Sequence, residues 1–212
     1  MEISEGMNRY AEEHTTEESP LMAQLNRDTH IKIMHPRMLS GHLQGKLLEF
    51  ISKWIHPQYI LEIGTFTGYS ALCLAQGLRP SGELHTIEIN DELKKFALSY
   101  INQSPLAASI KLHTGDALDI IPGFNITFDM VFIDAEKREY MDYYNAVIGK
   151  VRSGGVIIAD NVLWSGKVIE KPEKNDYDTK ALQQFNDYVH RDKRVENLLL
   201  PVRDGLMILR KI

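Results

Sequence analysis

The sequence predicts an α/β fold, with a mainly parallel, doubly wound sheet, an antiparallel last strand and helices before the sheet. From residue 59 onward, short apolar runs alternate with helical patterns, which is typical of a parallel sheet covered on both faces. Phe128–Ile133 is apolar almost throughout, as expected of a strand buried on both faces. The last two runs are joined only by the turn Pro201–Gly205, which is too short for a helical crossover, so that pair is antiparallel.

The N-terminal part of the chain is predicted to be helical. Carboxylates are dense in residues 1–19, which favours a solvated helix, and Pro20–His35 has a rough apolar face. His35–Gly41 is expected to be a loop, because Pro36 disfavours helical geometry in the residue before it. A helix over His42–Ile55 comes next. Its apolar side chains share one face at helical spacing: Leu43, Leu47, Phe50, Ile51 and Trp54.

Strands and helices then alternate to the end of the chain. The predicted strands are Tyr59–Ile63, Leu84–Ile89, Ile110–His113, Phe128–Ile133, Gly155–Ala159, Val195–Leu200 and Leu206–Leu209. The predicted helices are Gly68–Leu78, Asp91–Tyr100 with Asn90 as its N-cap, Arg138–Val151 and Thr179–Arg191. Together they form a Rossmann-like sheet core over residues 57–212 behind a helical extension over residues 1–56, in one domain. Ligands bind such sheets at the carboxyl ends of the strands.

Composition narrows the possible functions. Hydrophobic residues make up 43% of the chain and charged residues 25%, which is ordinary globular usage. No unbroken apolar stretch approaches about 18 residues, and the acidic start lacks the apolar region of a secretory signal, so neither a membrane span nor secretion is predicted. The single cysteine, Cys73, excludes an internal disulfide and a Cys-based zinc site and fits a cytoplasmic setting. The net charge of −5 is unfavourable for general binding to nucleic acid.

The first strand ends in a glycine-containing turn, Glu62–Ser70. Gly64 permits a tight turn and Gly68 opens the next helix, so a ligand can approach the backbone there. Phe66 stands where a G-x-G-x-x-G motif has its middle glycine, which disfavours a dinucleotide. Glu62 would repel a phosphate but could pair with an ammonium group on a ligand. A plain strand-to-helix turn with a capping carboxylate is an equally good interpretation of this segment.

Further acids follow the second and third strands. Glu88 lies 20 residues beyond Gly68, the spacing of an acid that accepts hydrogen bonds from ribose hydroxyls, although it could also be a plain exposed acid. Asp116 could contact an adenine amino group, but the cap of the following helix is the more common role for such a residue.

The ends of the fourth and fifth strands carry the sharpest signal. Asp134 follows the fourth strand, and Asp160 and Asn161 follow the fifth. If these strands are neighbours, three oxygen ligands converge, which suits a hard divalent cation such as Mg²⁺; helix capping is the alternative. Lys137 would lie over the same site, where a lowered pKa could make it a general base. A solvated lysine within a charged run is the simpler interpretation of its local sequence.

In this order the motifs resemble the bacterial type of the cation-dependent, S-adenosylmethionine-dependent O-methyltransferases, the family that includes catechol and caffeoyl-coenzyme A O-methyltransferases. The matching segments are Glu62–Ser70, Ile87–Asn90, Phe128–Lys137, Gly154–Trp164 and Leu200–Leu206. The resemblance covers the chain from about His35 to its end. It implies a class I methyltransferase fold, S-adenosylmethionine as methyl donor, Mg²⁺ or another divalent cation, and a homodimer.

The resemblance also implies a role for each residue at the strand ends. The cofactor would be held, from its methionine end to its adenine, by Glu62, Gly64, Ser70, Glu88, Asp116 and Ala117, with Met38 closing over it. Asp134 would border the cofactor and bind the metal together with Asp160 and Asn161. Lys137 would act on the substrate hydroxyl, and Trp164 would pack against the aromatic ring of a small catechol-like substrate.

Other functions stay open. The same site could methylate a hydroxylated uridine in tRNA, because bacterial members of this group include RNA-modifying enzymes, although the net charge of −5 counts against it. A nicotinamide-dependent oxidoreductase is disfavoured by Phe66 and by the lack of a Tyr-x-x-x-Lys motif. An inactive cofactor-binding module is disfavoured by the intact set of Asp134, Lys137, Asp160 and Asn161.

Overall fold

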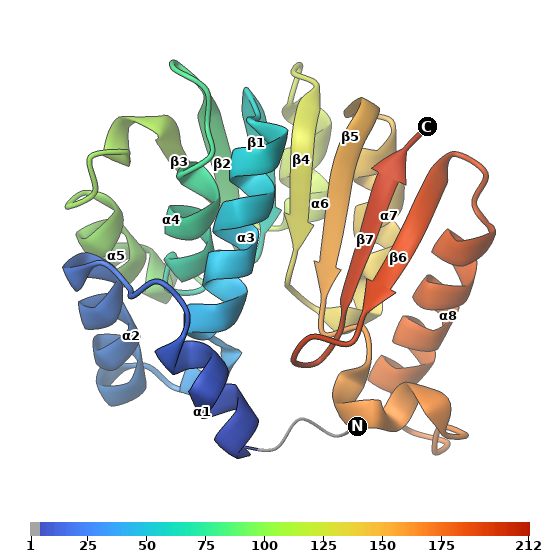
Figure 1. The fold of residues 1–212 in the computed structure, drawn as a ribbon. Coiled ribbons are helices and arrows are strands. Elements are labelled where there is room, and N and C mark those ends of the chain that lie inside the picture. Colours follow the sequence, from blue (N-terminus) through green and yellow to red (C-terminus); the bar gives the residue numbers. More distant parts are fainter. Residues whose placement is uncertain (1–4) are drawn as a thin grey trace.

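The computed structural model describes residues 5–212, and within them the strands form a seven-stranded sheet (Figure 1). The strands are β1 (Tyr59–Ile63), β2 (Glu83–Glu88), β3 (Ile110–Thr114), β4 (Phe128–Ile133), β5 (Val151–Asp160), β6 (Val195–Leu200) and β7 (Leu206–Lys211). Their order in the sheet is β3-β2-β1-β4-β5-β7-β6. Neighbouring strands among β1 to β5 are parallel, whereas β7 is antiparallel to both β5 and β6. The predicted fold class, including its antiparallel last strand, is confirmed.

Helices cover both faces of this sheet. The α-helices are α1 (Glu5–Glu13), α2 (Pro20–Lys32), α3 (Gly41–Ile55), α4 (Tyr69–Ala75), α5 (Asp91–Ile101), α6 (Ala117–Ile120), α7 (Tyr140–Ile148) and α8 (Tyr177–Arg191). Short 3-10 helices are η1 (Pro36–Met38), η2 (Ala107–Ser109), η3 (Ile121–Gly123), η4 (Lys137–Glu139) and η5 (Trp164–Ile169). Side chains of α2 to α5 pack on one face of the sheet and those of α6 to α8 on the other, so each strand end opens between two helical layers.

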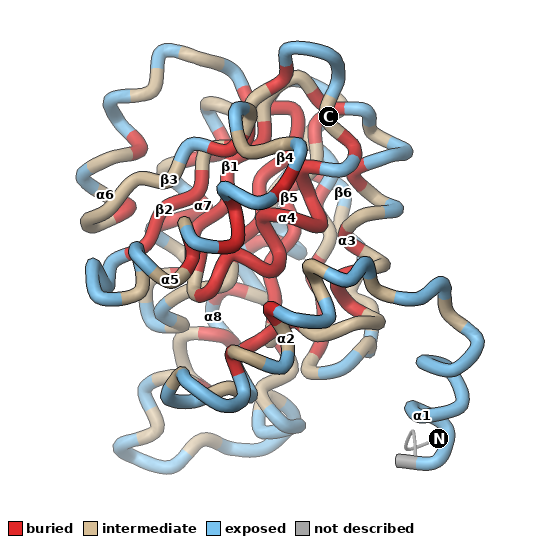
Figure 2. Tube along the Cα trace, turned by 90° about the vertical axis from the view of Figure 1, so that its left-hand side faces the viewer, coloured by how far each residue is buried: buried red, intermediate tan, exposed pale blue. Residues whose placement is uncertain are grey.

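The core lies along the central strands, which Figure 2 shows as buried. All six residues of β4 are buried, and alternate side chains serve opposite faces. Val131 and Ile133 pack with α7 and α8, while Met130 and Phe132 pack with α3 and α4. Each such side chain contributes about 1.5–3 kcal/mol on burial. This rigid centre holds the carboxyl ends of β1, β4 and β5 in place.

Several helices begin at polar side chains that accept a hydrogen bond from the first turn. Asn90 accepts from Glu92 N at 3.0 Å and caps α5, as the sequence predicted. Asp176 caps α8 by accepting from Thr179 N at 3.1 Å. Such caps satisfy backbone donors that a helix leaves unpaired at its start, so they determine where these elements begin.

The structure corrects three details of the sequence-based prediction. The helix predicted over Arg138–Val151 ends at Ile148, and Val151 begins strand β5, where it is paired with Phe128 of β4. Residues 166–169, for which the sequence predicts neither helix nor strand, belong to η5. The four-residue helix α6 was not predicted, because its single turn carries no helical periodicity.

Helix α3 has its boundary near the predicted one, but its apolar stripe is only partly covered: Leu47 and Ile51 pack against the core, whereas Phe50 and Trp54 do not. Phe50 is 43% exposed and Trp54 is 75% exposed. The buried face carries Gly45, where an added Cβ would lie 2.6 Å from the Tyr69 ring of α4. The absence of a side chain at Gly45 therefore lets α3 and α4 approach closely.

Within residues 5–212, no helix combines the length and the apolar character that crossing a membrane requires.

Candidate active site

Two acidic strand ends meet at the centre of the sheet. Strands β4 and β5 are neighbours, with Ile133 opposite Ala159, so Asp134 and Asp160 come next on adjacent strands. Asp160 is only 2% exposed. Asn161 follows in a left-handed conformation, with a φ of 58°, which turns the chain away from the sheet. The neighbouring strands that the metal prediction required are therefore present.

The Lys137 ammonium group connects these strand ends. Its Nζ donates to Asp134 Oδ1 at 3.0 Å and to Asn161 Oδ1 at 2.8 Å. A third bond goes to the Tyr140 hydroxyl at 2.7 Å. All three N–H donors of the ammonium group thus have a partner. The structure brings Asp134, Lys137 and Asn161 into one hydrogen-bonded cluster, and a cation already lies among their oxygen atoms.

The pKa of Lys137 departs from the sequence-based prediction. Burial acts to lower this pKa, but Tyr140 and Asp134 outweigh burial and raise the pKa of Lys137 above its ordinary value. The expectation of a lowered lysine pKa is therefore wrong for the arrangement that the structure shows. The pKa of Lys137 is raised because the contact with Tyr140 and the ion pair with Asp134 favour the charged form of the lysine.

Two side chains that sequence reasoning missed complete this cluster. Tyr140 is fully buried, and its hydroxyl donates to the backbone oxygen of Asp160 at 2.8 Å. Gln44 of α3 donates from Nε2 to Asp160 Oδ2 at 2.5 Å. Tyr140 follows Lys137 by three residues, about one helical turn, and this spacing was the available signal. The only sequence signal for Gln44 was that a polar residue stands in a helix predicted to be amphipathic.

Asp160 lies in an electrostatically unfavourable position. Burial, and after it the charge of Asp134, raise the pKa of the Asp160 carboxyl to about 7. Two carboxylates that repel one another across a small space, with an amide oxygen beside them, form a donor set that a divalent cation would stabilise. Within residues 5–212 no group of three or more His, Cys, Asp and Glu side chains has the arrangement of a metal site, so the candidate set consists of two carboxylates and one amide.

A cavity of about 810 Å³ opens beside this cluster, at the carboxyl ends of β1, β2 and β4. Five of the predicted site residues line it: Met38, Gly64, Glu88, Ala117 and Asp134. The wall also includes apolar and aromatic side chains, among them Ile63, Phe66, Ile89, Leu93 and Tyr143. The volume suits a ligand of nucleoside size, and the site is concave and mainly apolar, as small-molecule sites usually are.

Glu62 lies behind the wall of this cavity and is fully buried. Thr86 donates to its Oε2 at 2.5 Å, whereas Oε1 has no hydrogen bond of acceptable geometry within the described residues. Burial raises the pKa of Glu62 to about 8, and the neighbouring hydroxyls of Ser70 and Thr86 offset that only in part. A buried carboxyl oxygen without a donor is costly, so this position fits a ligand that brings a donor or a positive charge.

The turn after β1 depends on Gly64. Its φ is 100°, and an added Cβ would lie 1.9 Å from the backbone oxygen of Asp134. Any side chain here would force β1 and β4 apart at the point where the cavity begins. The neighbouring acid, Glu88, accepts from Phe66 N at 2.6 Å and from Asn90 N at 3.0 Å, which anchors its carboxylate at the cavity wall.

Three further predicted residues belong neither to the cavity wall nor to the hydrogen-bonded cluster around Lys137. Asp116 caps α6 by accepting from Leu118 N at 2.8 Å, the more common role that the sequence also allowed. Ser70 is buried in the first turn of α4. Trp164 is partly buried and packs against the core on the α7 and α8 side of the sheet. Their roles toward a ligand stay predictions.

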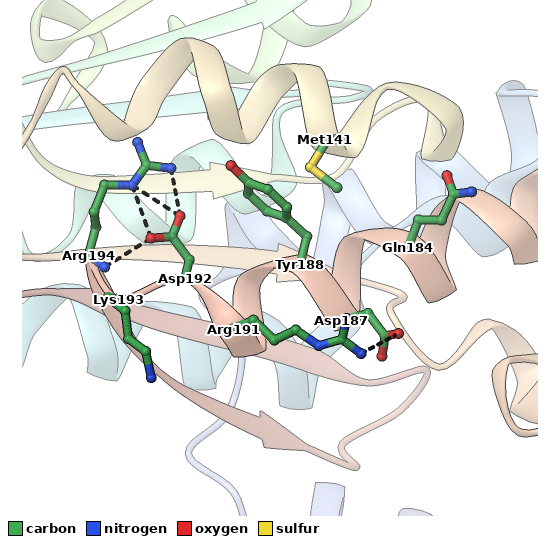
Figure 3. Close-up of a pocket in the computed structure, with 8 residues that line it drawn as sticks. All are labelled: Met141, Gln184, Asp187, Tyr188, Arg191, Asp192, Lys193 and Arg194. Atoms are coloured by element: carbon green, nitrogen blue, oxygen red, sulfur yellow. Dashed lines mark hydrogen bonds and ion pairs between the residues drawn. The ribbon is translucent and has the colours of Figure 1, made fainter.

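A second hollow of about 830 Å³ lies between α7, α8 and the start of β6 (Figure 3). Its cations are mostly neutralised by acids of the same surface. Arg194 is paired with Asp192 at 2.6 Å, and Arg191 with Asp187 at 3.2 Å. These short-range pairs leave little net positive charge for a polyanion.

Comparison with known proteins identifies relatives along nearly the whole chain. The O-methyltransferase family model matches residues 12–212. A caffeoyl-CoA O-methyltransferase of Eucalyptus globulus is 34% identical over 179 residues, which cover 80% of this chain and 73% of the relative. A caffeoyl-CoA O-methyltransferase of Nicotiana tabacum is 32% identical over 195 residues, covering 86% of this chain and 82% of the relative.

Solved structures agree with the sequence relatives. The O-methyltransferase TomG of Streptomyces achromogenes, in complex with SAM, superposes with a TM-score of 0.90 and 28% identity over 100% of this chain and 99% of that one. An O-methyltransferase of Bacillus cereus in complex with SAH gives a TM-score of 0.89 and 27% identity, over 97% of each chain.

Proposed function

The chain belongs to the O-methyltransferase family, and on that basis we propose that it transfers the methyl group of S-adenosylmethionine to a hydroxyl of a small catechol-like acceptor. The observation that carries the proposal is the cluster of Asp134, Lys137, Asp160 and Asn161, whose member Asp134 also lines a nucleoside-sized cavity. In this proposal the chain acts as a single-domain cytoplasmic enzyme, which is consistent with its one free, buried cysteine.

The cavity and its surroundings fit the methyl donor. The donor carries an ammonium and a sulfonium group, and the acids Glu62, Glu88 and Asp134 lie at or behind the wall. We assign the methionine end to Glu62, Gly64 and Ser70, the ribose to Glu88, the adenine to Asp116 and Ala117, and the cover to Met38. The oxygen of Glu62 without a donor supports the first of these assignments, because an ammonium group would supply the missing partner.

The oxygen cluster fits a divalent cation, for which Asp134, Asp160 and Asn161 are the proposed ligands. Carboxylate and amide oxygens suit Mg²⁺ or Mn²⁺, and a cation would relieve the repulsion that raises the pKa of Asp160. When bound, such a cation would lower the pKa of a phenolic hydroxyl of the acceptor.

Lys137 and Tyr140 supply the other polar groups of the proposed active site. A protonated Lys137 stabilises negative charge on the attacking oxygen, because its Nζ is fixed by Tyr140 and points among the oxygens of both strand ends. Lys137 can accept the hydroxyl proton only after its ammonium group has given a proton to solvent, and the ion pair with Asp134 opposes that loss. Orientation of the acceptor in line with the methyl group supplies further acceleration.

An aromatic acceptor has support from the surface next to the cluster. Trp164 begins η5 directly after the loop that carries Asn161, with backbone φ values in the left-handed region at Trp164 and Ser165. This loop places a partly buried indole three residues after Asn161, and we propose that the indole packs against the acceptor ring. The RNA acceptor remains the alternative, which the neutralised second hollow and the net charge of −5 do not favour.

A homodimer also belongs to the proposal. Two apolar side chains of α3, Phe50 and Trp54, are exposed, and their rings lie 6.0 Å apart. Exposed apolar residues grouped on one helix face are typical of a protein interface, so we place the subunit contact there.

The test is a transfer assay with labelled S-adenosylmethionine and a small catechol acid, run with Mg²⁺ and with a chelator. Transfer that the chelator abolishes and Mg²⁺ restores is the expected result. Methyl transfer at the same rate with and without the chelator would overturn the metal role of Asp134, Asp160 and Asn161. Transfer to a tRNA transcript, with no transfer to the catechol acid, would replace the proposed acceptor by the RNA alternative.

A further inference from the structure

The turn between β6 and β7 contacts the N-terminal part of the chain. Arg203, with a φ of 50°, donates from both guanidinium NH groups to the backbone oxygen of Leu39, each at 3.2 Å. The same guanidinium donates to Gln44 Oε1 at 3.2 Å. The proposed function gives no role to this turn, although its residues are among the segments that carry the family resemblance.

Gln44 passes this contact on to Asp160. Its side chain is 1% exposed, so water does not replace its hydrogen-bond partners. Its Oε1 accepts from Arg203, while its Nε2 donates to Asp160 Oδ2 at 2.5 Å. A flipped amide would place its oxygen against the carboxylate and its NH₂ against the guanidinium. Arg203 therefore stabilises the orientation in which the NH₂ end of the Gln44 amide faces Asp160.

The other atoms of Asp160 are held in the same way. Oδ1 accepts from the backbone N–H of Asn161 at 2.7 Å, and the backbone oxygen accepts from Tyr140 at 2.8 Å. Each carboxylate oxygen thus has one donor from the protein, which fixes the plane of the group and leaves further lone pairs for a ligand. Among these donors Gln44 is the side chain that reaches the carboxylate from outside β5.

We propose that Gln44 is a positioning residue for the Asp160 carboxylate and that Arg203 orients Gln44, so that this relay sets the affinity for the divalent cation. The inference rests on the proposed function, in which Asp160 is a ligand of that cation. The relay also ties the cation site to the segment that covers the cofactor, because Leu39 follows Met38 directly.

The size of the effect follows from the behaviour of outer hydrogen-bond partners of metal ligands. Loss of such a partner lowers metal affinity by about 10- to 100-fold. Gln44→Met keeps the length of the side chain and its burial but removes the donor. Arg203→Leu leaves the donor in place and removes only the contact that supports its orientation, so a smaller loss than in Gln44→Met is expected.

The experiment measures Mn²⁺ binding to the full chain by electron paramagnetic resonance, without methyl donor or acceptor. Wild type, Gln44→Met, Arg203→Leu and the double variant are compared. Ser52→Ala is the matched control, because Ser52 is a buried residue of the same helix whose hydroxyl donates to Leu74 O at 2.6 Å, away from the site. Melting curves and S-adenosylhomocysteine binding verify that each variant is folded.

We expect the Mn²⁺ dissociation constant to rise about 10- to 100-fold in Gln44→Met and to stay unchanged in Ser52→Ala. The double variant should bind as Gln44→Met does, since Arg203 acts only through Gln44. Wild-type affinity in Gln44→Met, or an equal loss in Ser52→Ala, would overturn the inference and leave the proposed function standing. If Gln44→Met does not fold, Arg203→Leu decides in the same way. A wild-type chain that binds no Mn²⁺ would overturn the metal role and the relay together.

Discussion

Replacing Glu62 by Gln tests whether the buried carboxyl at the end of β1 pairs with the ammonium group of the methyl donor. Burial raises the pKa of Glu62 to about 8, so the folded chain holds a proton there at neutral pH. An uncharged carboxyl makes no ion pair, and its ionised form is stabilised when a cation arrives. Binding of the donor should therefore drive the proton into solution.

The magnitude follows from that pKa. At pH 7, one unit below a pKa of about 8, roughly nine-tenths of the Glu62 carboxyls are protonated. A free α-amino group, with a reference pKa of about 7.7–8.0, is already mostly charged at pH 7 and takes up only about 0.1–0.2 proton on becoming fully charged. The net release should be about 0.7–0.8 proton for each ligand bound, and it should shrink as the pH rises through about 8.

Calorimetry counts these protons directly. S-Adenosylhomocysteine serves as the probe, because it cannot donate a methyl group, and the titration is repeated in buffers with different ionisation enthalpies. The slope of the apparent binding enthalpy against buffer ionisation enthalpy gives the number of protons released. Glu62→Gln should abolish the release and weaken binding by about 10-fold or more, since a hydrogen bond to a charged group is worth about 1.5–3 kcal/mol.

Glu92→Gln is the control, because Glu92 lines the same cavity from its exposed rim and the substitution removes the same charge. It should leave the proton release intact. A wild-type binding enthalpy that is identical in all buffers would refute the reasoning, because Glu62 would then either be ionised before the ligand arrives or lie unpaired after it. Equal release from wild type and Glu62→Gln would assign the proton to another group.

Four further predictions follow from the site and the surface. Asp160→Ala should abolish metal-dependent methyl transfer while calorimetry still detects S-adenosylhomocysteine binding; equal loss of both would contradict its role as a metal ligand. Gly64→Ala should remove that binding and lower the melting temperature by roughly 4–8 °C, about 2 kcal/mol, because the new Cβ would lie 1.9 Å from the Asp134 backbone oxygen; a wild-type melting curve would contradict this. Trp54→Glu should convert a dimer into a monomer in light scattering without loss of transfer, and a persistent dimer would exclude this helix face. Finally, the pKa of Glu62 is higher in the folded chain than its ordinary value of 4.5. Glu62 therefore does not destabilise the folded chain below about pH 4.5, and its destabilising effect grows as the pH rises toward 8. Urea unfolding should show that the stability difference between wild type and Glu62→Gln changes over this range and is flat below it.

The sheet was predictable because its signals are local. The boundaries of β1, β4 and β6 match the prediction, since each is an apolar run that ends at a turn or a polar residue. The first half of β5 was missed because Arg152 and Ser153 are exposed and break the apolar run. What makes that half a strand is its pairing with β4, for example Val151 opposite Phe128, and pairing is not written in the local pattern.

Helix α3 shows the same limit from the other side. Its periodicity correctly predicts a helix, but it does not say which face the sheet will cover. The structure buries the face with Gly45, because close approach to α4 requires a residue without a side chain at that point. Where a small residue decides packing, a count of apolar side chains does not tell which of them are buried. Leu47 and Ile51 pack against the core, whereas Phe50 and Trp54 are exposed and form a candidate contact surface.

In the site, too, some features follow from the local sequence and others depend on residues far away in the chain. Asp134 and Asp160 could be placed together from the sequence, because parallel neighbouring strands bring their carboxyl ends to one edge. The pKa values of Lys137 and Asp160 could not be predicted from the sequence. The pKa of Lys137 depends on the Tyr140 hydroxyl, and that of Asp160 depends on burial and on Asp134.

The orientation of the acids depends on still more distant contacts. Gln44 reaches Asp160 across 116 positions of the chain, and Arg203 reaches Gln44 across 159. No spacing rule connects such residues, because the fold rather than the sequence makes them neighbours. Strand ends therefore indicate which oxygens can bind a cation, whereas the side chains that aim those oxygens are found only in the structure. For that reason the Mn²⁺ affinity of Gln44→Met is a more direct test of the site than a substitution of any predicted ligand, because it changes the aim of Asp160 and leaves every ligand in place.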